Sequence, residues 1–152
     1  MKIALPAIAI TTLLMSVIHA GPIAAQNTEQ STAAAAAVQA TVDRLFDAMR
    51  AKDAAALRTL FLPEARLDTS DVDAWVQQVS GSSAYLDEVT YDEIIVVDQD
   101  LAMAWTPYTL YVNEVLHHCG VDAFILRMTE GEWKILQLND TRRKESCPDP
   151  RS

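Results

Sequence analysis

Long apolar runs and surplus positive charge are both missing from this sequence of 152 residues. The longest apolar block, residues 3–17, contains Pro6 and is shorter than the ~20 residues that a membrane-spanning helix needs. Lysine and arginine number 12 against 21 acidic residues, which gives a formal net charge of −9. Such a surface repels phosphate backbones and acidic lipid head groups. We therefore expect no nucleic-acid partner, and we interpret the charge mainly as a source of solubility.

The N-terminal residues have the layout of a secretory signal peptide. Met1-Lys2 precedes the apolar block, and small residues suited to cleavage follow at Ala20 and Ala24-Ala25. We expect cleavage after Ala25, a periplasmic or secreted protein, and no membrane contact afterwards, with an uncleaved anchor as the alternative. The remainder has the size of one domain. The expected organisation is a signal peptide at 1–25, a flexible polar and alanine-rich linker at 26–35, a folded domain at 36–147 and a tail at 148–152.

Helical periodicity predicts three helices before residue 82. One apolar stripe, spaced by three and four residues, consists of Val38, Val42, Leu45, Phe46 and Met49. Asp53 is placed to cap a short second helix, which Pro63 stops. Residues 65–69 are expected to form an extended link. Ser70 with Asp73 resembles a weak capping box for a third helix, which ends near Gly81.

Alternating apolar and polar residues replace the helical period after Tyr85. Four long strands are predicted, at residues 86–97, 101–112, 116–128 and 133–141. The polar segments at 98–100 and 130–132 read as tight turns, so neighbouring strands should pair antiparallel. The expected class is α+β, with three N-terminal helices packed on a strongly curved antiparallel sheet in a cone shape that encloses a pocket.

The order of several short motifs resembles exported bacterial members of the nuclear transport factor 2-like (NTF2-like) superfamily, those labelled SnoaL-like or lumazine-binding. The motifs are Leu101 to Tyr108, His118-Cys119-Gly120, Trp133-Lys134-Ile135, Asp140 to Arg143, and Cys147. The resemblance spans residues 36 to 147. It implies a cone-shaped cavity, a homodimer through the outer face of the sheet, and ligand binding or catalysis, since fold alone does not decide function.

Ketosteroid isomerases within that superfamily use a tyrosine on the first helix and a carboxylate base after the second. Leu45 stands where the tyrosine should be, and Asp68 lies near the position of the base. Asp68 beside Thr69 and Ser70 is more typical of a turn or cap. Without the oxyanion donor, the larger electrostatic contribution is missing, so we do not expect this isomerase chemistry.

The densest group of reactive side chains contains His117, His118, Cys119 and Asp122. Strand alternation places His118 and Asp122 on one face and the other two on the opposite face, so neither adjacent His-Cys pair can act as base and nucleophile. No motif supplies a further metal ligand, and we expect neither a metal nor a cofactor. Cys119 and Cys147 are the two cysteines, and in an oxidising compartment they are expected to form one disulfide.

Asp140 and Arg142 share a face at the end of the last strand, and two interpretations stay open. They form an exposed ion pair of little energetic weight, or they orient a ligand beside His118 and Tyr108. Large aromatic side chains belong to the core or the dimer face, with some lining the cavity; they are Trp105, Tyr108, Tyr111, Phe124 and Trp133.

The main functional hypothesis is an exported protein that binds a small, largely apolar molecule through Trp105, Tyr108, His118 and Phe124. One alternative is a SnoaL-like isomerase, cyclase or dehydratase that uses His118 with Asp122 or Asp140 as acid and base. A second alternative is a dimeric interaction module with a filled cavity. An empty apolar cavity favours binding, and convergent acids with shifted pKa values favour catalysis.

Overall fold

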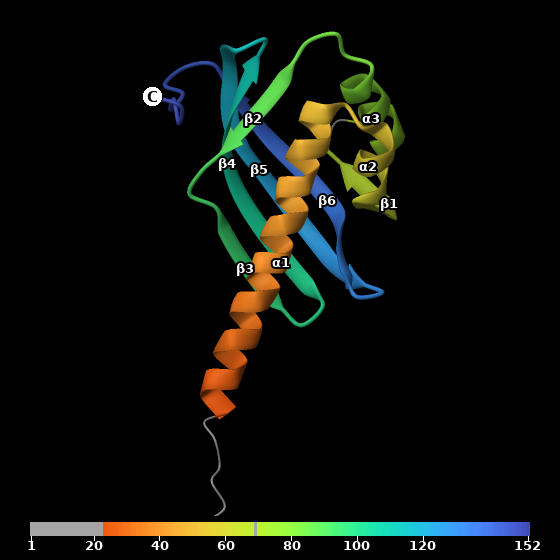
Figure 1. Cartoon of the computed structure of the whole chain (residues 1–152), viewed down its shortest axis with the longest axis vertical. Coiled ribbons are helices and arrows are strands. Elements are labelled where there is room, and N and C mark those ends of the chain that lie inside the picture. Colours follow the sequence, from red (N-terminus) through yellow and green to blue (C-terminus); the bar gives the residue numbers. More distant parts are fainter. Residues whose placement is uncertain (1–22, 69) are drawn as a thin grey trace, which may run out of the picture.

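A computed structural model describes residues 23–68 and 70–152, and it shows one long helix lying across a sheet (Figure 1). Further helices accompany the long one at one end of the sheet. In chain order the elements are α1 (Ile23–Ala51), α2 (Ala54–Thr59), β1 (Phe61–Leu67), α3 (Val72–Ser80), β2 (Leu86–Thr90), β3 (Ile94–Asp98), β4 (Leu101–Val112), β5 (Val115–Thr129) and β6 (Glu132–Arg143).

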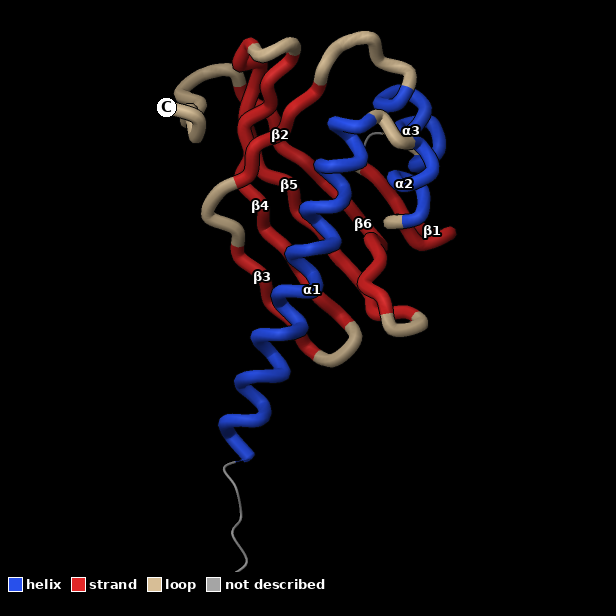
Figure 2. Tube along the Cα trace, viewed as in Figure 1, coloured by secondary structure: helices blue, strands red, loops and turns tan. Residues whose placement is uncertain are grey.

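The strands form a single sheet in the order β1-β6-β5-β4-β2, and β3 also pairs with β4 (Figure 2). β4, β5 and β6 are antiparallel neighbours joined by short turns, as the sequence predicts. β1 pairs parallel with β6 and is the exception to antiparallel pairing. The α+β class with a curved sheet is confirmed, but the helices do not form an uninterrupted N-terminal set, because β1 lies between α2 and α3.

The inner face of the sheet packs against the apolar stripe of α1. Val38, Val42 and Leu45 are completely or almost completely buried, as their spacing predicts. Phe46 meets Phe124 of β5 edge to face, with ring centroids 6.3 Å apart. This contact fixes how α1 crosses the sheet. The segment 26–35, expected to be a linker, is part of α1.

α2 and α3 lie together beside the C-terminal half of α1, next to β1 (Figure 1). Asp53 caps α2 as expected, because its carboxylate accepts a hydrogen bond of 2.9 Å from the Ala56 amide. The prediction for α3 was wrong by one residue. Asp71, not Ser70, is the N-cap and accepts from the amides of Asp73 and Ala74.

Two segments differ from their expected strand pattern. The region of the expected link is the strand β1, whose register shifts between Phe61 and Arg66 around Pro63. Proline has no amide to donate to a ladder, so it is tolerated at such an irregularity. The expected strand at 86–97 is two strands, β2 and β3, interrupted at Asp92, which has a φ of 52°. Both pair with β4, at different parts of its length.

The C-terminal tail is fastened to the outer face of the sheet. The expected disulfide joins Cys119, which is completely buried, to Cys147. Thr109 Oγ1 donates a hydrogen bond of 2.9 Å to the Pro148 carbonyl, and the Tyr111 hydroxyl donates to Asp149. The tail therefore covers one end of β4 and β5.

None of the helices in the described part of the chain is long and apolar enough to cross a membrane. The predicted signal peptide at 1–25 lies mostly outside the described residues, so its cleavage stays a prediction. Cleavage after Ala25 would remove the first residues of α1.

Candidate functional site

A cavity of about 200 Å³ lies between α1, α3 and the inner face of the sheet. Most of its wall is apolar. The apolar side chains are Leu45, Phe46, Met49, Leu67, Trp75, Val79, Leu86, Leu110 and Leu138. The polar side chains come mainly from the sheet, and they are Asp68, Ser70, Gln78, Glu88, Tyr108, His118, Asp122, Asp140 and Arg142.

Strand register brings the polar side chains of the sheet together in rows. Glu88 of β2 and His118 of β5 are both opposite Leu110 of β4. In a second row, Gly120 lies between Tyr108 and Arg142; in a third, Asp122 lies between Thr106 and Asp140. Since alternate residues of a strand share a face, all three rows face the cavity side of the sheet.

Gly120 is the position where neighbouring groups approach too closely for any side chain. A Cβ atom there would lie 1.7 Å from the Thr141 carbonyl oxygen and 3.1 Å from the Tyr108 ring. The ring of Tyr108 therefore extends from β4 over β5, and its hydroxyl donates a 3.0 Å hydrogen bond to the Thr141 carbonyl on β6. Burial and the surrounding carboxylates raise the pKa of Tyr108, so the phenol stays protonated.

Glu88, which is half-buried, and Asp122, which is buried, form a pair of acids in the cavity wall. Burial raises the pKa of Glu88 well above its usual value, and the neighbouring Asp122 adds to the shift. Burial also raises the pKa of Asp122 to about 7, against an opposing effect of its hydrogen bond with Glu88. Two carboxyl groups in contact cannot both ionise easily, so near neutral pH the pair holds a proton that it can donate or recover.

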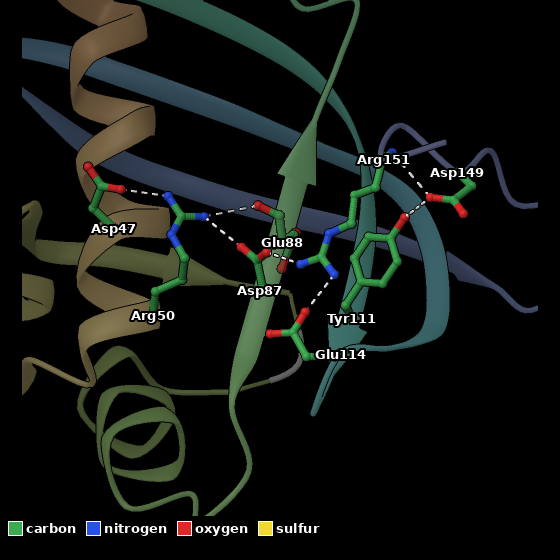
Figure 3. Close-up of polar contacts among 8 residues, drawn as sticks. All are labelled: Asp47, Arg50, Asp87, Glu88, Tyr111, Glu114, Asp149 and Arg151. Carbon is green, nitrogen blue, oxygen red and sulfur yellow. Dashed lines mark hydrogen bonds and ion pairs between the residues drawn. The ribbon is translucent and has the colours of Figure 1, made fainter.

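The position of Glu88 is fixed by contacts on its own strand. Arg50 of α1 donates to the Asp87 carboxylate at 3.0 Å and to the Glu88 carbonyl at 3.3 Å. Arg151 of the tail also donates to Asp87. Figure 3 shows the two guanidinium groups approaching β2 from different elements, with Tyr111 beside Arg151. β2 is thus tied both to α1 and to the C-terminal tail.

His118 is buried at the end of the cavity and is neutral at pH 7. Its ring meets the Tyr108 ring edge to face at 5.7 Å, and its Nδ1 lies 2.7 Å from the Nδ1 of His117. Burial lowers the pKa of His118, and the nearby His117 and Arg142 lower it further. A neutral imidazole can accept a hydrogen bond from a ligand or donate one.

Asp140 and Arg142 form an ion pair in the cavity wall. The Asp140 side chain is mostly buried, whereas Arg142 is largely exposed. The exposed pair considered from the sequence is therefore half-buried, and its carboxylate lies on the cavity side. Asp68, the residue near the isomerase base position, lines the cavity as well, and so does Leu45 in place of the tyrosine.

The structure brings some of the expected ligand-contacting residues to the cavity and not others. Tyr108 and His118 line it, together with the candidate acids Asp122 and Asp140. Phe124 is part of the core under α1. Trp105 is 43% exposed among the outer-face residues of β4. Its odd-numbered position puts it on the face opposite Tyr108, so neither Trp105 nor Phe124 lines the cavity.

Glu88 is the cavity acid that sequence reasoning missed. It lies in a short strand, two residues after Leu86, and both line the cavity. That shared alternation was the available signal. It went unused because Asp87 next to Glu88 made the segment look solvent-exposed and because the break between β2 and β3 was not anticipated. Within residues 23–68 and 70–152, no three histidine, cysteine or acidic side chains are arranged to hold a metal ion.

No protein-family model matches this sequence, and no curated protein does. Solved structures do match its fold. An NTF2-like protein of unknown function from Pseudomonas putida aligns with a TM-score of 0.67 at 13% identity, over 76% of this chain and 91% of that one. An NTF2-like protein with a cystatin-like fold from Novosphingobium aromaticivorans aligns with a TM-score of 0.65 at 13% identity, over 81% and 88%.

A third similar structure is that of a candidate dehydratase from the NTF2-like family of Streptomyces avermitilis. It aligns with a TM-score of 0.66 at 14% identity, over 74% of this chain and 98% of that one. Identities this low establish a shared fold and leave the activity open.

Proposed function

We propose that this chain, which has the NTF2-like fold, is an exported protein that binds a small, largely apolar molecule carrying one hydrogen-bonding group. The observation that carries the proposal is the cavity, whose wall is mainly apolar and whose polar groups converge from adjacent strands. Ligand pockets commonly combine an apolar lining with a few placed polar groups. The volume of about 200 Å³ lies below the roughly 300 Å³ of the smallest drug-sized pockets, which favours a small ligand.

The polar groups favour a carbonyl or hydroxyl group on that ligand. The protonated Glu88–Asp122 pair can donate a hydrogen bond to a carbonyl oxygen, and it cannot neutralise an anion as a lysine would. His118, which lies in the same row as Glu88, supplies a neutral partner. A ligand with one such group satisfies these side chains while its remaining surface contacts the leucines.

A screen of small neutral ketones and alcohols by thermal shift tests this proposal. The best ligand is then titrated calorimetrically against wild type and Leu110→Trp, in which an indole occupies the cavity. We expect the variant to lose at least tenfold in affinity. Leu116→Trp is the matched control, because Leu116 does not line the cavity and is exposed. Equal affinity of wild type and a folded Leu110→Trp protein would contradict binding in the cavity.

His118→Ala provides a second arm of the same titration. Its imidazole is expected to contribute to affinity, so the variant should bind the ligand more weakly while still folding. Unchanged affinity would remove His118 from the binding site and leave it a packing role against Tyr108.

An acid–base enzyme is the second candidate, and the raised pKa values of Glu88 and Asp122 favour it. The ionised member of the pair would abstract a proton from the carbon next to a ligand carbonyl, and the protonated acid partner would donate to the developing oxyanion. Proton magnetic resonance in D₂O measures this as exchange of that proton for deuterium. We expect exchange in wild type and its loss in Asp122→Asn, and absence of exchange for every bound ketone would favour binding alone.

A further inference from the structure

A second pocket, lined by cationic and histidine side chains, adjoins the cavity. Its wall consists of His117, His118, Arg142, Arg143 and Lys144, and its volume is about 270 Å³. His118 and Arg142 also line the cavity described above, so the two pockets share that part of the wall. No acidic side chain lines this second pocket. We call it the cationic pocket.

The cations of this pocket have few partners within the described part of the chain. Arg142 uses its Nε to donate to Asp140, which leaves its terminal nitrogens available. No ion pair joins Arg143 or Lys144 to any acid in residues 23–68 and 70–152. Arg127 of the sheet and Arg151 of the tail differ, since Arg127 pairs with Asp100 and Arg151 with Asp87.

Local charge at this pocket is opposite to that of the whole protein. The chain carries a net charge of −9, yet two arginines and a lysine follow one another at 142–144. Their effect reaches the shared wall, because Arg142 and Lys144 both help to lower the pKa of His118. Like charges close together repel unless an anion lies between them, so the arrangement is favourable chiefly for an anionic partner.

We propose that the cationic pocket is an anion subsite, which binds a carboxylate or phosphate group of the same molecule whose apolar part occupies the cavity. Arg142 and Arg143 would donate to the anion in the manner of guanidinium groups, and Lys144 would add a point charge. The inference rests on the proposed function, because it assigns the second end of the cavity ligand. It also gives that ligand a definite polarity, with an anionic head at the cationic pocket and, inside the cavity, a neutral and largely apolar body that carries the carbonyl or hydroxyl group.

The charge distribution of the cavity supports this polarity. Asp140 is neutralised by Arg142, but the Glu88–Asp122 pair keeps negative charge even when it retains a proton, and Asp68 also lines the cavity, so the interior repels an anion. An anion at the cationic pocket therefore lies next to the available arginine nitrogens and away from the acids. His118, on the shared wall, contacts the ligand where the head group meets the body.

Histidine ring resonances provide the readout for a test, because the chain has three histidines and two of them line the cationic pocket. The probes are acetate, hexanoate, hexyl phosphate, inorganic phosphate and the neutral 2-hexanone, each titrated at low ionic strength where charge interactions are least screened. We expect hexanoate and hexyl phosphate to bind at least tenfold more tightly than 2-hexanone. The affinity for hexanoate should also exceed the affinity for acetate by several fold for each pair of added methylene groups, because each pair buries further apolar surface in the cavity.

The double variant Arg143→Gln/Lys144→Gln should weaken hexanoate binding at least fivefold and leave 2-hexanone unchanged. The matched control is Arg127→Gln/Lys134→Gln, which removes the same charge from the opposite end of the β5–β6 hairpin. It should change hexanoate binding by less than twofold. If both double variants lose the same affinity for hexanoate, the effect comes from the net charge of the protein alone, and the subsite is overturned.

Failure of the inference and failure of the proposed function give different results. If 2-hexanone binds in the cavity and hexanoate binds no more tightly, the subsite is overturned and the cavity proposal stands. If acetate and phosphate shift His117 and His118 but chain length adds no affinity and 2-hexanone does not bind, the pocket binds anions without the cavity. That result overturns both the link between the two sites and the proposed cavity ligand.

Discussion

Single residues hold the candidate site in place, and Gly120 has the most restricted position among them. The Tyr108 ring and the Thr141 carbonyl both occupy the space where a side chain would begin. Through this approach, Tyr108 connects β4 to β6 across β5 with a hydrogen bond. Position 120 requires a residue without a Cβ atom. It does not require an unusual backbone conformation, because among the described glycines the positive φ belongs to Gly131 and not to Gly120.

Gly120→Ala is expected to destabilise the protein by at least about 3 kcal/mol, because a rigid backbone carbonyl must move to admit the methyl group. Gly131→Ala is the matched control. Its Cβ would meet nothing within 4 Å, but its φ of 83° should cost only about 1 kcal/mol. Urea denaturation of the two variants measures both values. A loss no larger at Gly120 than at Gly131 would show that β6 yields easily.

The Glu88–Asp122 pair makes a contribution to stability that decreases as the pH rises. The folded-state pKa of Asp122, about 7, exceeds its usual 3.8, and that of Glu88 is shifted in the same direction. Between about pH 4 and 7 the folded protein therefore binds more protons than the unfolded chain. The contribution of this pair to the free energy of unfolding is fully present below about pH 4 and is lost as the pH rises through about 7.

Glu88→Gln/Asp122→Asn is expected to remove that dependence. Relative to the double variant, wild type should lose roughly 2 to 4 kcal/mol of unfolding free energy between pH 4.5 and 8. His118, whose lowered pKa acts in the opposite direction, is present in both proteins, so its effect cancels in the difference. Urea denaturation of both proteins across this pH range measures the difference in unfolding free energy. Parallel pH profiles for the two proteins would contradict a buried proton-sharing pair.

Whole elements were predictable from the sequence where one physical pattern dominated. The α1 stripe and the β4 to β6 strands follow regular burial periods, and all of them form as expected. β1 escaped prediction because its pairing with β6 is long-range and because Pro63 reads as a stop. The break between β2 and β3 depends on the positive φ of Asp92, which composition does not specify.

The candidate site was predictable to a similar degree. Alternation along β5 put His118 and Asp122 on the face opposite Cys119, as observed, but it also separated His117 from His118, and their Nδ1 atoms lie 2.7 Å apart beside an irregularity of the β4–β5 register. The role of Glu88 depended on a side-chain contact between β2 and Asp122 of β5, which no local pattern records. The cationic pocket forms only because residues 142–144, at the end of β6, lie beside His117 of β5 in the folded protein. Such meetings of distant segments are tertiary properties.

The disulfide between β5 and the tail is expected to leave no free thiol in protein purified from an oxidising compartment. Mass spectrometry of the unreduced, alkylated protein measures this, and alkylation of both cysteines would contradict it. Cys119→Ala/Cys147→Ala should lower the unfolding free energy by about 3 to 4 kcal/mol, because the unfolded chain gains freedom. Arg151→Ala, which releases the tail from Asp87 but retains the disulfide, is the milder control.

The outer face of the whole molecule is divided between the tail and an uncovered apolar area. At one end, the tail covers Thr109, Tyr111 and Cys119. At the other end, β3 and β4 leave large side chains exposed, and register places them side by side. These residues, which we call the outer patch, are Ile94, Val96, Leu101, Met103 and Trp105. Monomeric proteins rarely expose large contiguous apolar patches without an interaction partner.

We propose that a second copy of the chain covers the outer patch, as the resemblance to NTF2-like proteins implies. Light scattering at micromolar concentration should then give twice the mass of one chain. Met103→Glu/Trp105→Glu is expected to yield a folded monomer, because four buried charges would face one another across the interface. Val115→Glu/Leu116→Glu, which alters exposed residues at the opposite end of the sheet, should remain dimeric.

Since the outer patch does not line the cavity, the monomeric variant should bind the cavity ligand within about twofold of wild type. A monomeric wild type would leave the patch to another partner, and a dimeric Met103→Glu/Trp105→Glu protein would place the interface elsewhere.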